Sequence, residues 1–131
     1  MKAWRHVDAV VEIESGERAV GEKLIKKEGF LEGHFPGRPI QPGVLTLEGM
    51  VEVAKRLVRE TTRTSQKGGT RVDLLRIEKA KFLEIVLPGE KLLFEVKVAS
   101  WNKKEVRFNG KALVGEKLKA DATFVLSFNT V

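Results

Sequence analysis

The sequence contains no cysteine and no tyrosine, and only two histidines and four prolines among its 131 residues. The absence of cysteine excludes a disulfide framework and a thiolate metal site. Two histidines without a close pairing argue against a histidine-based metal site as well. No apolar run approaches the roughly 20 residues needed to cross a bilayer, and the polar opening segment does not resemble a signal peptide. We therefore expect a cytoplasmic protein without a metal ion.

The composition is that of one soluble globular domain spanning residues 1–131. Hydrophobic residues make up 42% of the chain and charged residues 32%, which is ordinary for a domain that buries its own core. The net charge of +6 favours an acidic partner. Nucleic acid is one such partner, but the basic residues are interleaved with acidic ones and form no aromatic–basic motif of single-strand binders. The charge alone does not choose between nucleic acid and an acidic protein.

Apolar residues in partial or full alternation predict strands at both ends of the chain. Two strands around the turn Ser15–Glu17 predict a hairpin, and four more are expected after residue 70, separated by turns at Pro88-Gly89, 101–104 and 115–116. The predicted strands are Ala3–Glu14, Arg18–Lys27, Arg71–Phe82, Lys91–Ser100, Glu105–Val114 and Lys117–Phe128.

A helix is predicted from about Val44 to Thr61. At about 100° per residue, its apolar residues fall on one arc and its charged residues on the other. The apolar arc holds Leu47, Met50, Val53, Ala54, Leu57 and Val58. One helix followed by consecutive antiparallel strands gives an α+β class, and we expect the helix to bury its apolar side against a wrapped sheet.

The segment before this helix concentrates the residues that shape a backbone. Prolines fix φ and glycines permit conformations that other residues avoid, so this segment predicts a stiff, ordered loop. It contains Pro36, Pro39, Pro42, Gly33, Gly37 and Gly43. The loop presents His34 beside a helix N-terminus, and Glu48 follows one turn into the helix. A histidine and a carboxylate in such an arrangement indicate acid–base chemistry.

The run His34-Phe-Pro-Gly-Arg-Pro-Ile-Gln-Pro-Gly-Val-Leu-Thr-Leu-Glu48 closely resembles the signature of the β-hydroxyacyl-[acyl-carrier-protein] dehydratases. Weaker resemblance extends to 7–13, 76–82 and 86–92. The resemblance implies a hot-dog fold, in which a curled antiparallel β-sheet wraps around one central α-helix. It also implies a lyase that converts (3R)-hydroxyacyl thioesters into trans-2-enoyl thioesters in fatty-acid-type synthesis.

The same resemblance implies the roles of the site residues. His34 is expected to be the base at C2 of the substrate, and Glu48 to hold the C3 hydroxyl and assist its departure as water. The backbone N–H groups of Gly43 and Val44 open the helix and are expected to form an oxyanion site for the thioester carbonyl. No cofactor is implied, because the substrate is carried on the phosphopantetheine of an acyl carrier protein.

The resemblance further implies an assembly. The partner is an acyl carrier protein, whose acidity suits the charge of this chain, and the enzyme is a homodimer or a trimer of dimers. His34 and Glu48 of one site are expected to come from different protomers. Arg38, Arg63 and Arg71 are candidates for docking the carrier protein.

Several residues depart from the family pattern and keep other interpretations open. Gly49 and Glu52 stand where the family usually has alanine and glutamine, and Arg76 stands where glycine is usual. A thioesterase that activates water with Glu48 or Glu52 is one alternative, and a non-catalytic module that binds acyl thioesters is another. His34 is also compatible with a structural loop histidine, and Glu48 with an unpaired solvent-facing position. His6 is interpreted as a surface or strand-end histidine.

Overall fold

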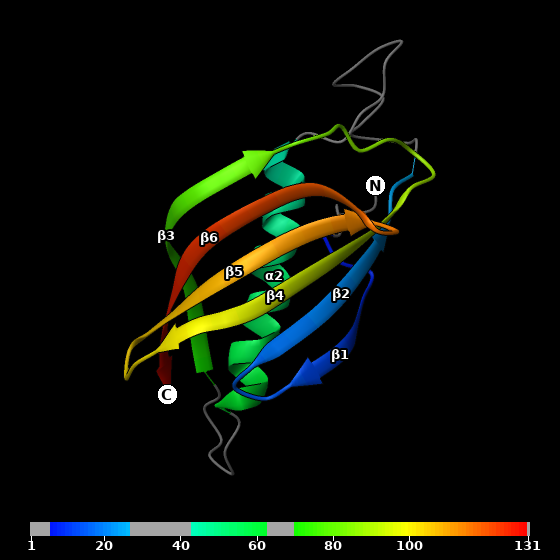
Figure 1. Cartoon of the computed structure of the whole chain (residues 1–131). Coiled ribbons are helices and arrows are strands. Elements are labelled where there is room, and N and C mark those ends of the chain that lie inside the picture. Colours follow the sequence, from blue (N-terminus) through cyan, green and yellow to red (C-terminus); the bar gives the residue numbers. More distant parts are fainter. Residues whose placement is uncertain (1–5, 27–42, 63–69, 131) are drawn as a thin grey trace, which may run out of the picture.

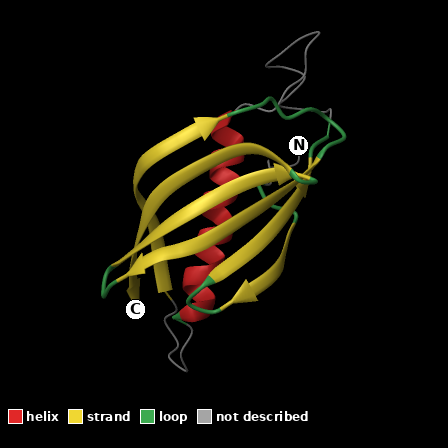
Figure 2. Ribbon diagram, in the orientation of Figure 1, coloured by secondary structure: helices red, strands yellow, loops and turns green. Residues whose placement is uncertain are grey.

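The computed structural model describes residues 6–26, 43–62 and 70–130. Within these residues, six strands form one antiparallel sheet that curls around the helix α2 (Figures 1 and 2). The helix spans Gly43–Thr61, close to the predicted range. The strands are β1 Ala9–Glu14, β2 Arg18–Leu24, β3 Thr70–Phe82, β4 Lys91–Trp101, β5 Glu105–Val114 and β6 Lys117–Thr130. This arrangement confirms the predicted α+β class and hot-dog architecture.

The order of strands across the sheet is β1-β2-β4-β5-β6-β3. The pairs β1–β2, β4–β5 and β5–β6 are neighbours in both sequence and space, and each is joined by a short turn. Strand β3 instead pairs with β6, the last strand, and so lies at one edge of the sheet (Figure 1). Its register shifts near Leu74 and near Ile77, and such irregularities bend a strand. The bends fit the curl of this edge around the helix.

The core lies between α2 and the concave face of the sheet. Every residue of the predicted apolar arc of the helix is buried, which confirms the helical periodicity. The sheet contributes its largest buried side chains from three neighbouring strands, namely Phe94 on β4, Phe108 on β5 and Phe124 on β6. The rings of Phe108 and Phe124 stack with their centroids 5.7 Å apart. Because the apolar arc of α2 packs on the sheet, the opposite face of the helix points away from the sheet.

The turn between β1 and β2 is tied to the end of the helix. Gly16 has a φ of 77°, which favours glycine, and its N–H donates to Oγ1 of Thr61 at 2.8 Å. Oγ1 of Thr61 in turn donates to the carbonyl of Leu57 at 2.8 Å. On β2, the hydrogen bond to Glu14 raises the pKa of Arg18 above its usual range. The hairpin is therefore held both to itself and to α2.

The strand boundaries differ from the predicted ones mainly at the N-terminus. β1 begins at Ala9 rather than Ala3, and residues 1–5 lie outside the described part of the chain. β2 ends at Leu24, because Ile25 leaves the ladder and exchanges backbone hydrogen bonds with Glu90 and Gly89. The turns at 88–89 and 115–116 are where the sequence places them, with a positive φ at Gly89 and at Gly115.

Candidate functional site

The first turn of α2 is the part of the described chain in which the oxyanion site is expected. The helix begins at Gly43, its first turn contains no acidic residue, and Val44 is 57% exposed. The first N–H groups of a helix have no partner within it and lie at the positive end of its dipole. The backbone around Gly43 and Val44 is therefore suited to hold an oxygen that gains negative charge.

Phe82, the last residue of β3, lies over this helix start. A Cβ added at Gly43 would be 2.9 Å from Cδ1 and 3.0 Å from Cε1 of the Phe82 ring. Phe82 itself is half-exposed, so its ring forms part of the accessible surface beside the first turn of α2. A side chain at residue 43 would therefore displace this ring.

Glu48 lies one turn further along α2, on the side away from the core. Its side chain is 49% exposed, and its Oε2 lies 3.1 Å from Nε2 of His6, which is 33% exposed. The carboxylate therefore faces outward as the helical periodicity predicts, but it is not unpaired. The interpretation of His6 as a surface histidine without a role is incomplete, because the fold brings it to the second turn of the helix.

The remaining predicted site residues are only partly described. His34 lies outside the described residues, as do Arg38 and Arg63. Arg71 is described and is strongly exposed, and its Nε lies 3.0 Å from Oδ2 of Asp73. Glu52 lies on α2 one turn after Glu48 and is partly buried. The structure thus places Gly43, Val44 and Glu48 on the first two turns of α2.

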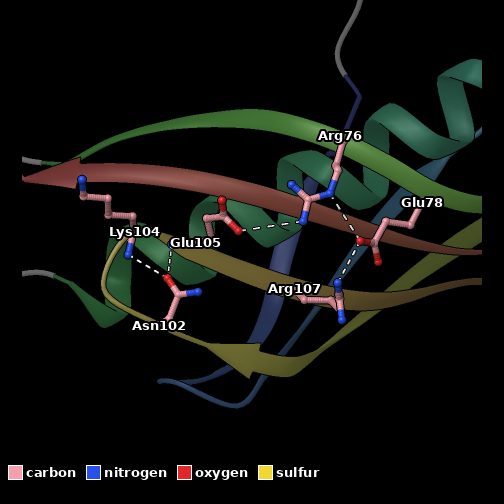
Figure 3. Close-up of polar contacts among 6 residues, drawn as sticks. All are labelled: Arg76, Glu78, Asn102, Lys104, Glu105 and Arg107. Atoms are coloured by element: carbon pink, nitrogen blue, oxygen red, sulfur yellow. Dashed lines mark hydrogen bonds and ion pairs between the residues drawn. The ribbon is translucent and has the colours of Figure 1, made fainter.

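Arg76 belongs to a different group of charges. Its Nε lies 3.3 Å from Oε2 of Glu78, which also accepts a 2.8 Å hydrogen bond from Arg107, and its Nη2 lies 3.9 Å from Glu105 (Figure 3). Arg76 and Arg107 both lie opposite Val125 in register. Val125 points away from the core that contains its neighbours Phe124 and Leu126.

This charged group therefore lies on the convex face of the sheet. A shallow depression beside it is lined by Arg76, Ser100, Asn102, Glu105, Arg107 and Val125. Asn102 accepts backbone hydrogen bonds from Lys104 and Glu105 and so shapes the turn next to the depression (Figure 3). Since the two arginines are matched by two glutamates, the group is a surface ion-pair network, and Arg76 does not contact the helix start.

The free edge of β3 carries apolar side chains that the protomer leaves exposed. Leu74, Leu75 and Ile77 are each at least 40% exposed. Leu74 and Ile77 pair in register with Leu126 and Phe124, so they extend the concave apolar face past the helix. An edge strand with exposed apolar residues is a surface on which another strand can pair. This edge belongs to β3, the strand that ends at Phe82.

The described residues contain neither a candidate metal cluster nor a candidate membrane-spanning helix. In residues 6–26, 43–62 and 70–130, no group of three His, Cys, Asp or Glu side chains is placed to hold a metal ion. In the same ranges, no helix has the length and apolarity that crossing a membrane requires.

Comparison with known proteins gives one consistent result for the sequence. A model of the FabA-like domain matches residues 2–126. The chain is 39% identical over 117 residues to the 3-hydroxyacyl-[acyl-carrier-protein] dehydratase FabZ of Caldanaerobacter subterraneus subsp. tengcongensis, covering 88% of this chain and 81% of that protein. It is 34% identical over 126 residues to FabZ of Variovorax paradoxus, covering 95% of this chain and 84% of that one.

Solved structures with the same fold belong to a more varied set of proteins. Smu.793 from Streptococcus mutans, bound to acetyl CoA, aligns with a TM-score of 0.75 at 14% identity, covering 99% of this chain and 94% of that one. The dehydratase heterocomplex ApeI:P from Xenorhabdus doucetiae aligns with a TM-score of 0.70 at 13% identity, covering 94% and 82%. A mutant of the fluoroacetyl-CoA-specific thioesterase FlK aligns with a TM-score of 0.73 at 11% identity, covering 92% and 90%. At these identities the likeness is one of fold.

Proposed function

This chain belongs to the FabA-like family of β-hydroxyacyl-[acyl-carrier-protein] dehydratases, and from that premise we propose how it carries out the reaction. The enzyme removes water from 3-hydroxyacyl-[acyl-carrier-protein] thioesters in fatty-acid synthesis. The observation that carries this function is the identity of 34–40% over most of the chain to FabZ enzymes. The site is supported by the position of Glu48, one turn past the start of α2 at Gly43.

The dehydration requires a base and an acid on either side of the C2–C3 bond. We assign the base to His34, which takes the proton from C2, and the acid to Glu48, which gives a proton to the C3 oxygen as the C–O bond breaks. A C2–C3 double bond forms and water leaves. The enzyme returns to its starting state when His34 releases its proton and Glu48 takes one up. These steps need only side chains and backbone amides, so the proposed mechanism uses no cofactor.

Negative charge develops on the thioester oxygen when C2 loses its proton. The N–H groups of Gly43 and Val44 are the proposed donors to that oxygen, since preorganised donors at a helix start stabilise such charge. The absence of an acid in the first turn supports this role, because no carboxylate of that turn competes for the positive end of the helix. Phe82 beside Gly43 supplies an apolar wall for the substrate near the same point.

We propose that two protomers pair through the free edge of β3. The support is the row of exposed apolar residues on this strand, Leu74, Leu75 and Ile77, together with the general preference of soluble chains for two-fold dimers. In the proposed dimer, His34 of one protomer lies beside Glu48 of its partner, and the proposed assembly is this homodimer or a trimer of such dimers. The acidic carrier protein approaches a chain of net charge +6, and a cytoplasmic location follows from this pathway.

The test is to incubate the protein with 3-hydroxyacyl thioesters of several chain lengths and to follow the absorbance of the enoyl product. We expect turnover by the wild type, and a loss of about 10²- to 10⁴-fold in kcat for His34→Ala and for Glu48→Gln. Lys97→Ala on the outer face of β4 is the control and is expected to keep full activity. Release of free thiol without enoyl product would identify a thioesterase instead, and binding without turnover would identify a binding module.

A further inference from the structure

We infer that His6 is a positioning residue that holds the carboxyl of Glu48 in place for its part in dehydration. The inference rests on the proposed function of Glu48 and adds a residue outside the signature run 34–48. Its starting observation is the 3.1 Å contact between His6 Nε2 and Glu48 Oε2. The two residues come from the segment before β1 and from the second turn of α2, so only the folded chain brings them together.

The segment that carries His6 is anchored on its C-terminal side. Val7 is partly buried and packs against the core. The N–H of Asp8 donates to the carbonyl of Glu22 at 2.8 Å, and Oδ2 of Asp8 accepts from the N–H of Leu24 at 2.8 Å. Oδ1 of Asp8 lies 3.5 Å from Nζ of Lys23. His6 therefore extends from a fixed backbone, which is what a side chain needs in order to orient another.

The contact with His6 uses only one of the two carboxyl oxygens of Glu48. Within the part of the chain that the structure describes, Oε2 of Glu48 meets His6, and Oε1 has no partner. A carboxyl held through one oxygen presents the other in a defined direction, here toward the exposed side of α2. Oε1 is then the atom that meets the C3 hydroxyl. His6 does not touch the substrate in this arrangement, since its effect passes through Glu48.

At 3.1 Å, Nε2 of His6 is within donating distance of Oε2 of Glu48. Hydrogen bonds with an ionised partner are shorter and stronger than neutral ones. Loss of His6 would leave Glu48 free to rotate and would remove this donor.

The test compares His6→Ala with His6→Gln. A glutamine amide can donate from nearly the same position as Nε2, whereas alanine cannot. We expect His6→Ala to lower kcat about tenfold, the size of one hydrogen bond to a charged group, with KM little changed. His6→Gln should stay within about threefold of the wild type if the donor is what matters. Equal losses in both variants, or no loss in His6→Ala, would overturn the inference.

Two controls separate a positioning role from a structural one. Lys91→Ala breaks a contact of the same length, 3.1 Å to Glu22, on the neighbouring strands, and it should leave kcat unchanged. In a Glu48→Gln background, His6→Ala should cause no further loss, because its effect passes through the carboxyl. Independent losses from the two substitutions would contradict the inference.

A readout without catalysis distinguishes failure of this inference from failure of the proposed function. The chain has only two histidines, so His6 can be assigned in a spectrum of side-chain ¹⁵N resonances by comparison with His6→Gln. We expect the His6 resonances to move in Glu48→Gln and to stay in place in Glu52→Gln. Unmoved resonances would overturn the contact itself. A wild type that forms no enoyl product would overturn the proposed function, whatever the spectrum shows.

Discussion

Gly49 of α2 lies against the ring of Phe94 on β4, and the contact leaves no space for a side chain at residue 49. A Cβ added there would lie 2.7 Å from Cε1 and 2.9 Å from Cε2 of the ring, and closer still to Cζ. Phe94 is fully buried, so its ring has no open space into which it can move. The glycine that departs from the family pattern is thus explained by the aromatic residue opposite.

We predict that Gly49→Ala destabilises the protein. Overpacking a core costs about 1–3 kcal/mol, and the better helix propensity of alanine offsets about 1 kcal/mol of this. We expect the free energy of unfolding, measured with urea, to fall by up to about 2 kcal/mol after this offset. In a Phe94→Leu background the same change should be neutral or stabilising. A loss of equal size in both backgrounds would show that the ring is not the cause.

Gly43→Ala should separate activity from stability. The ring of Phe82 that it displaces is half-exposed, so the ring can swing outward, and we expect the free energy of unfolding to change by less than about 1 kcal/mol. If the amides of residues 43 and 44 hold the thioester oxygen, kcat should fall about 10²-fold or more. The measurements are urea unfolding and enoyl formation on the same preparation.

The companion variant is Phe82→Ala, which removes the displaced ring. If the double variant with Gly43→Ala regains activity, the ring caused the loss by blocking the site. If activity stays low, the methyl group at residue 43 itself obstructs the oxyanion site. Full activity of Gly43→Ala alone would contradict the assignment of the amides.

The fold was largely predictable because its elements are short-range patterns. The apolar arc of the helix follows from a period of 3.6 residues, and every member of that arc is buried. The hairpin around Gly16 and the turns at Gly89 and Gly115 follow from local glycine chemistry. The pairing of β3 with β6 was not predicted, because it joins strands separated by most of the C-terminal half. No local pattern encodes such a pairing.

The candidate site likewise has one part that local sequence patterns predict and one part that depends on the tertiary fold. Glu48 was proposed as a site residue from the signature run, and its outward position was predicted from the helical period. His6 was missed as its partner, because the contact depends on how the segment before β1 crosses the helix. The nearest available signal was the Val7-Asp8 pair, which anchors that segment. Arg76, which stands where the family usually has glycine, takes part in ion pairs on the convex face with Glu78 and Glu105.

A buried lysine offers a test of how the segment after β3 is held. The side chain of Lys119 is only 8% exposed. Its Nζ donates to the carbonyl of Ile85 at 3.1 Å and lies 3.6 Å from Oε2 of Glu90. Lys119→Met leaves that carbonyl without its donor, which should lower the free energy of unfolding by about 1–3 kcal/mol. The control is Lys117→Met on the same strand, which removes the exposed ion pair between Nζ of Lys117 and Oε1 of Glu84, 2.9 Å apart. This substitution should lower the free energy of unfolding by less than about 1 kcal/mol. Equal effects would argue that burial of Lys119 is unimportant.

The shared site can be tested by mixing two inactive variants. If each site combines His34 of one protomer with Glu48 of its partner, a heterodimer of His34→Ala and Glu48→Gln has one site with both residues intact. Random exchange after mild unfolding and refolding makes half of the dimers mixed, so activity should return to about one quarter of the wild type. Either variant refolded alone should remain inactive.

The position of the interface can be tested in the same experiment. Ile77→Asp puts a charge among the exposed apolar residues of the β3 edge, and a buried unpaired charge is costly. We expect this substitution, added to both inactive variants, to abolish complementation and to halve the mass measured by sedimentation. Lys97→Ala, on the outer face of β4, should change neither. Complementation that survives Ile77→Asp would place the interface elsewhere, and failure of the original mixture would mean that each protomer holds a complete site.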